Sequence, residues 1–73
     1  MEKTKGIIEA ILFSAGRPVK IQELILNLEI DKEEIEKIIN QMQEEYKSEE
    51  RGIQIIKIED AYQLCTNQEY YEN

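Results

Sequence analysis

The chain has no histidine and no tryptophan, and its 73 residues include one cysteine, one proline and three glycines. A single cysteine, Cys65, excludes an internal disulfide, and the absence of histidine excludes a zinc site built from cysteine and histidine. A chain this short buries only about 60% of the surface that its unfolded form exposes, so its stability is marginal. We therefore expect a protein partner, rather than a covalent cross-link, to support the fold.

Long apolar runs are also lacking. No stretch approaches the ~20 apolar residues that are needed to span a bilayer. The most apolar stretch, residues 7–15, contains Glu9, which argues against a secretory signal peptide. The unpaired Cys65 suits a reducing compartment. We expect a cytoplasmic protein with no membrane contact.

Basic residues are in the minority, with nine Lys and Arg against sixteen Asp and Glu and a net charge of −7. Phosphate contacts supply most of the affinity of nucleic-acid binders, so these proteins usually carry a basic face. The basic residues here are spread along the chain, whereas the acidic ones cluster. The charge therefore predicts no direct nucleic-acid contact.

Three stretches show the apolar spacing of amphipathic helices. The first, residues 4–15, ends at Gly16 with Pro18 beyond it, an order typical of a helix C-terminus. The second covers residues 21–28, and its start shows no good capping residue. The third opens at Asp31, with Glu34 three residues later as in a capping box, and ends near residues 47–48. Each helix is expected to turn its apolar residues toward a common core: Ile7, Ile8, Ile11 and Ala15 in the first, Ile21, Leu24, Ile25 and Leu28 in the second, and Ile35, Ile38, Ile39, Met42 and Tyr46 in the third.

The apolar period changes after residue 52. Residues 53–58 are rich in isoleucine and predict a strand, the doubled Ile55-Ile56 indicating either a bulge or burial on both faces. Residues 59–61 predict a turn and residues 62–66 the returning strand, after which Asn67 is a plausible helix cap. A hairpin alone is marginal in water, so it must lie on the helices. The order predicts an α+β, mainly α fold of the winged helix-turn-helix type, three helices followed by a C-terminal β-hairpin.

Two stretches resemble the segregation and condensation protein B family. One is IIEAILFSAGRPV at residues 7–19, and the other combines RGIQII at residues 51–56 with AYQLCT at residues 61–66. The spacing of the two stretches and the acidic helix between them also fit. The resemblance covers nearly the whole chain, and the pair of motifs is more specific than either motif alone.

The resemblance implies a partner and an assembly. Family members carry two winged-helix domains in tandem, form homodimers and bind the kleisin subunit (segregation and condensation protein A) of the SMC condensin complex, which organises and segregates chromosomes. Residues 1–66 would then be the first winged-helix domain. Residues 67–73 would start the connecting helix to a second winged-helix domain that this sequence does not contain.

Phe13 is the most informative candidate for a protein interface. If Ile11 marks the core direction of its helix, Phe13 points to the outer side, and Leu12 lies at the edge of the core face. A helix that is apolar almost all round is usually buried on more than one side. Ile8, Leu12 and Phe13 are therefore candidates for a dimer or inter-domain contact. The alternative is that the hairpin or the C-terminal segment covers Phe13.

Tyr70 and Tyr71 are further interface candidates, because tyrosine combines a large contact area with a polar tip. No catalytic constellation accompanies them. The adjacent glutamates at 33–34, 44–45 and 49–50 do not face each other on a helix, and Cys65 is expected to be a buried small hydrophobe without a histidine as base. We expect no enzyme, no metal and no cofactor.

Two binding functions remain open from the sequence. The first is a self-associating scaffold of the SMC complex that binds the kleisin. The second is a winged-helix transcription regulator, which would need a basic stripe on the third helix or the wing. Residues 31–47 carry six acidic residues and three lysines, a net charge of −3, and Glu59 and Asp60 lie at the tip of the wing. This balance favours the scaffold.

Overall fold

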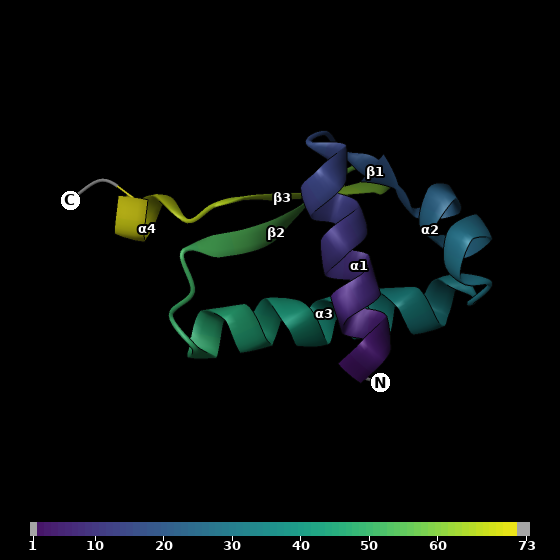
Figure 1. Ribbon diagram of the computed structural model, residues 1–73, viewed down its shortest axis with the longest axis horizontal. Helices are drawn as coiled ribbons and strands as arrows, with labels where there is room; N and C mark the ends of the chain where they lie inside the picture. Colours follow the sequence, from purple (N-terminus) through teal and green to yellow (C-terminus); the bar gives the residue numbers. More distant parts are fainter. Residues whose placement is uncertain (1, 72–73) are drawn as a thin grey trace.

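A computed structural model describes the backbone of residues 2–71 and the side chains of residues 3–69. The chain forms α1 (Glu2–Ala15), β1 (Val19–Lys20), α2 (Ile21–Leu28), α3 (Lys32–Ser48), β2 (Ile53–Ile58), β3 (Ala61–Thr66) and α4 (Gln68–Tyr71). Figure 1 shows α3 along the long axis, α1 crossing in front of it, α2 at one end and the β2–β3 hairpin above. The predicted winged-helix order of three helices and a hairpin is confirmed.

The helix boundaries follow from local chemistry. Gly16 takes a left-handed φ of 62° directly after α1, a conformation that costs glycine little. The Asp31 carboxylate accepts a hydrogen bond from the Glu34 N–H at 3.0 Å, so Asp31 caps α3 as the sequence predicts. The start of α2 is held differently, because the Ile21 N–H donates to the Asp60 carbonyl in the hairpin turn at 2.9 Å.

The sheet has three antiparallel strands in the order β1-β3-β2. The third strand, β1, is a difference from the expected two-stranded hairpin: Val19 pairs with Tyr62 and Lys20 with Ala61. A residue before proline favours extended geometry, which suits the short strand that follows Pro18. Ala61, expected in the turn, belongs to β3 because it pairs with both Lys20 and Ile58.

The doubled isoleucine is accommodated without a bulge. The β2–β3 register runs without interruption from Ile53 opposite Thr66 to Ile58 opposite Ala61. Ile55 is buried under the helices, while Ile56, on the opposite face, is half-buried. Of the two interpretations of Ile55-Ile56, the bulge is wrong, and burial on both faces is only partial because Ile56 stays half-buried.

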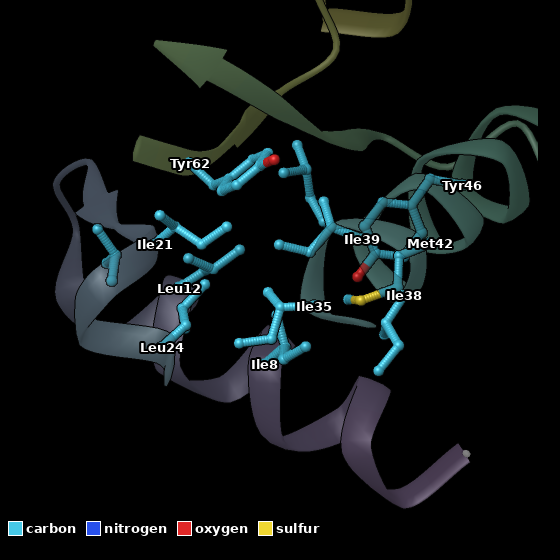
Figure 2. Packing of buried hydrophobic residues seen from close by; sticks show 12 residues of the cluster. Ile8, Leu12, Ile21, Leu24, Ile35, Ile38, Ile39, Met42, Tyr46 and Tyr62 are labelled. Carbon is cyan, nitrogen blue, oxygen red and sulfur yellow. The ribbon is translucent and has the colours of Figure 1, made fainter. Parts of the chain in front are cut away.

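One core lies between the helices and the inner face of the hairpin. Figure 2 shows side chains from α1, α2, α3 and β3 converging on it. Its members are Ile8, Leu12, Val19, Ile21, Leu24, Ile35, Ile38, Ile39, Met42, Tyr46, Ile55 and Tyr62. Burying each of the larger aliphatic side chains contributes about 1.5–3 kcal/mol, so this cluster is the main stabilising element of the fold. Among the residues that the structure describes, no helix is long and apolar enough to cross a membrane.

Candidate protein-interaction surfaces

The candidate interface residues of α1 separate into a buried pair and an exposed one. Ile8 is 0% and Leu12 1% exposed, and both pack in the core against the other helices. Extending the interface to these two residues was wrong, because the core direction of α1 lies along Ile8 and Leu12 rather than along Ile11. Ile11 is only partly buried, and Ile7 at the edge of the helix is 42% exposed.

Phe13 is on the surface, with 76% of its side chain exposed. The hairpin therefore does not cover it, and the alternative of internal cover by the described part of the chain is wrong. The ring borders a groove of about 340 Å³ between α1 and the hairpin. This α1–hairpin groove is lined by Gly6, Glu9, Ala10, Phe13, Ile53 and Leu64. All but Glu9 are apolar, so the groove can take an apolar side chain from another molecule.

Glu9, which lines the α1–hairpin groove, belongs to a polar cluster with Tyr46 and Arg51. The Tyr46 hydroxyl donates to Glu9 Oε2 at 2.6 Å, and Arg51 Nη2 lies 3.5 Å from the same oxygen. The Arg51 guanidinium also stacks over the Tyr46 ring, 4.7 Å from its centroid. Burial raises the pKa of the Tyr46 hydroxyl, and its bond to Glu9 raises it further. The Tyr46 hydroxyl therefore fixes the position of the Glu9 carboxylate, and the Arg51 guanidinium offsets its negative charge.

The charge of α1 differs from that of α3. Within α1 two acids (Glu2 and Glu9) balance two lysines (Lys3 and Lys5), a net charge of zero. Within α3 five acids oppose three lysines, a net charge of −2, and most of these side chains are exposed. The exposed side of α1 is thus the neutral, apolar part of an acidic molecule. The acidic face of α3 is solvated and lacks the basic stripe that a DNA-reading helix needs.

A second depression lies between α3 and the outward edge of β2 and shares Ile53 with the α1–hairpin groove. This α3–β2 cleft, of about 380 Å³, is lined by Gln43, Glu44, Tyr46, Lys47, Ile53, Gln54, Ile55, Asn67 and Glu69. Inside it the Gln43 side-chain amide donates to the Ile55 carbonyl at 2.9 Å. Sequence reasoning missed this cleft, because its lining comes from three segments that are separate in the sequence, α3, β2 and residues 67–69.

Leu26 on α2 is 76% exposed, a surface leucine that the sequence reasoning overlooked although the spacing of its neighbours turns it outward. Tyr70 and Tyr71 lie in α4, which follows Asn67, whose side-chain oxygen accepts from the Glu69 N–H at 3.0 Å. The side chains of Tyr70 and Tyr71 lie outside the described residues.

The described residues hold no group of three or more acidic or cysteine side chains placed to bind a metal ion. Cys65 is half-buried on the outer face of β3, so the expectation of full burial was wrong. The outer face of the hairpin is covered less than its inner face, because all three long helices pack on the inner side.

Comparison with known protein families identifies the family to which the chain belongs. Residues 6–73 match the family model described as segregation and condensation complex subunit ScpB. The chain belongs to this family. Among the relatives, segregation and condensation protein B of Clostridioides difficile (strain 630) is 49% identical over 73 residues, covering 97% of this chain and 41% of that protein. The protein of the same name from Caldanaerobacter subterraneus subsp. tengcongensis is 46% identical over 66 residues, covering 90% of this chain and 39% of that protein. The chain thus spans about two fifths of the length of these ScpB relatives.

Solved structures agree with this assignment. A crystal structure described as a dimer of the ScpB N-terminal domain complexed with ScpA peptide superposes with a TM-score of 0.87 at 31% identity, covering 96% of this chain and 88% of that one. A conserved hypothetical protein from Chlorobium tepidum gives a TM-score of 0.82 at 22% identity, covering 97% of this chain and 45% of that one, and supports the fold alone.

Proposed function

We propose that the chain is a non-catalytic, self-associating subunit of an SMC–kleisin complex of the condensin type. It would bind the kleisin subunit, and through it SMC, in chromosome condensation and segregation, in the cytoplasm at the nucleoid. The observation that carries the proposal is the likeness, at 31% identity, to a ScpB N-terminal domain that was crystallised as a dimer with a ScpA peptide. Continuation of α4 into a connecting helix and a second winged-helix domain is part of the same proposal.

The α1–hairpin groove is the surface we assign to self-association, with a second copy of this chain as its occupant. Two copies that each carry a charge of −7 repel one another, and the repulsion is weakest where they meet through their neutral, apolar parts. The exposed side of α1 is such a part. Phe13 from each copy would enter the groove of the other, burying a large aromatic ring at the centre of a two-fold contact.

The molar mass of the chain in solution tests the proposal, measured by light scattering over a concentration series with and without the kleisin subunit. We expect a dimer that binds kleisin. Phe13→Ser should weaken self-association by about 30-fold or more, the equivalent of a hot-spot loss of ~2 kcal/mol.

Leu26→Ser is the matched control, since Leu26 is as exposed as Phe13, at 76%, but lies on α2. This variant should keep the molar mass of the unmodified chain. A monomer at every concentration that also fails to bind kleisin would overturn the proposed function. Equal weakening by both variants would remove the assignment of the α1–hairpin groove.

A further inference from the structure

The strand β2 is an edge strand, since it pairs on one side with β3 and the sheet ends there. The Asn67 N–H donates to the Gly52 carbonyl at 2.7 Å. This bond shows which residues of the two strands form hydrogen-bonded pairs. In an antiparallel pair the bonded residues alternate. Gln54, Ile56 and Ile58 therefore point their backbone groups toward β3, and Ile53, Ile55 and Lys57 point theirs away from it.

The outward edge of β2 faces the α3–β2 cleft. The Ile55 carbonyl is the evidence, because it accepts its bond from the side chain of Gln43, which also lines the cleft. No second strand pairs with this edge in the part of the chain that the structure describes. The N–H of Ile55 and both backbone groups of Ile53 therefore have no strand partner among the described residues. An unpaired edge of this kind is a template for another extended chain.

The lining of the cleft suits a peptide backbone. Gln43, Gln54 and Asn67 bring side-chain amides that can both donate and accept hydrogen bonds. Glu44 and Glu69 outweigh Lys47, so the charged groups of the cleft sum to −1 on a molecule of −7. Complementary charge therefore favours a segment that carries lysine or arginine.

We propose that the α3–β2 cleft binds an extended, basic segment of the kleisin subunit as a fourth strand along β2. The inference rests on the proposed function for the identity of this partner. The added strand would take the hydrogen bonds offered by Ile53 and Ile55, and the Gln43 amide would leave the Ile55 carbonyl to make room. Gln43 thus shields the edge when the segment is absent. Its amide substitutes for one bond of the missing strand.

Amide hydrogen exchange of the full chain, measured by NMR while synthetic peptides that tile the kleisin subunit are added, tests the proposal. A bound peptide should slow the exchange of the Ile53 and Ile55 amides by at least about tenfold. The Gln54 and Ile56 amides are internal controls, because they are already bonded to β3 and should change far less.

The outcomes separate the two proposals. If no tiled peptide binds, kleisin binding fails and this inference fails with it. If a peptide binds and leaves the Ile53 and Ile55 amides unaffected, kleisin binding stands and the strand addition is wrong. If those two amides slow with rising protein concentration alone, a second copy occupies the edge and the peptide assignment is overturned.

A variant of Gln43 gives an independent readout. Gln43→Ala frees the Ile55 carbonyl in advance, so the peptide no longer has to displace a hydrogen bond. Its affinity should rise by about two- to tenfold, the range expected for one such bond. Gln41→Ala is the matched control, an exposed glutamine of the same helix outside the cleft, and should leave the affinity unchanged. An unchanged or lower affinity in Gln43→Ala would contradict the shielding role.

Discussion

At the scale of single residues, two neighbours on α1 have opposite surroundings. Leu12 is 1% exposed and Phe13 76% exposed, although both are large and apolar and adjacent in sequence. A residue on a helix is turned by about 100° from the one before it, so neighbours can lie on different sides of the boundary between core and solvent. The fold requires the first side chain, and within the described part of the chain it does not use the second.

This contrast predicts different effects on the free energy of unfolding. Leu12→Ala should lower it by about 2–5 kcal/mol, because the substitution leaves a cavity in the core. Phe13→Ala should change it by less than about 0.5 kcal/mol when measured under conditions in which the chain is monomeric. Urea titration at low protein concentration measures both. A loss of several kcal/mol in Phe13→Ala would mean that Phe13 is covered within its own chain.

At the scale of elements, the ends of the helices show how local chemistry and backbone strain compete. Gly16 ends α1 in a left-handed conformation without cost, but α2 ends with a glutamate in the same region, Glu29 at φ 56°. The Glu29 N–H still donates to the Ile25 carbonyl at 2.8 Å, so the hydrogen bond of the helix end is made. The side chain of Glu29 makes this conformation less favourable than it is for glycine.

The strain at Glu29 can be relieved by substitution. Glu29→Gly should raise the free energy of unfolding by about 0.5–1 kcal/mol, the gain from removing a Cβ at a left-handed position less the added freedom of the unfolded chain. Glu44→Gly, in the middle of α3, is the control and should lower the free energy of unfolding by about 1 kcal/mol. Thermal unfolding of the two variants measures whether their stabilities change in opposite directions. A lower stability in both variants would refute the strain argument.

At the scale of the whole molecule, the net charge would oppose the proposed association of two copies. Each copy carries −7, and the acids are concentrated away from α1. Exposed charges that lie more than a Debye length apart are largely screened, and this length shrinks from ~30 Å at 0.01 M salt to ~10 Å at 0.1 M. A contact between two copies through an apolar surface therefore forms against a repulsion that salt removes.

Salt should accordingly strengthen self-association. Raising sodium chloride from about 0.01 M to 0.15 M should tighten the dimer by several-fold, on the order of 1 kcal/mol, because screening weakens the repulsion of the two copies. Analytical ultracentrifugation at a series of salt concentrations measures the dissociation constant. A double variant, Glu33→Gln with Glu34→Gln, makes the net charge of each copy less negative. It should reduce the salt dependence of the dissociation constant. Weakening with salt would instead indicate ion pairs across the contact.

The sequence by itself determined the first three helices, the β2–β3 hairpin and their order. Gly16, Pro18 and Asp31 act on the backbone within a few residues, so they set helix ends that the structure reproduces. The apolar period of 3.6 before residue 52 and the isoleucine-rich stretch after it separated the helices from the hairpin. The motifs at residues 7–19 and 51–66 were sufficient for the family, which the comparisons support independently.

Only the tertiary structure decided which sides of these elements are buried and which stay exposed. Periodicity states which residues share a face, but the rotation of α1 depends on simultaneous packing against several other elements, and this turned Ile8 and Leu12 inward and left Phe13 outside. The pairing of β1 with β3 and the placing of Gln43 against the edge of β2 are likewise contacts between distant segments. Such contacts depend on where the whole chain closes around its core, a condition that no local stretch of sequence expresses.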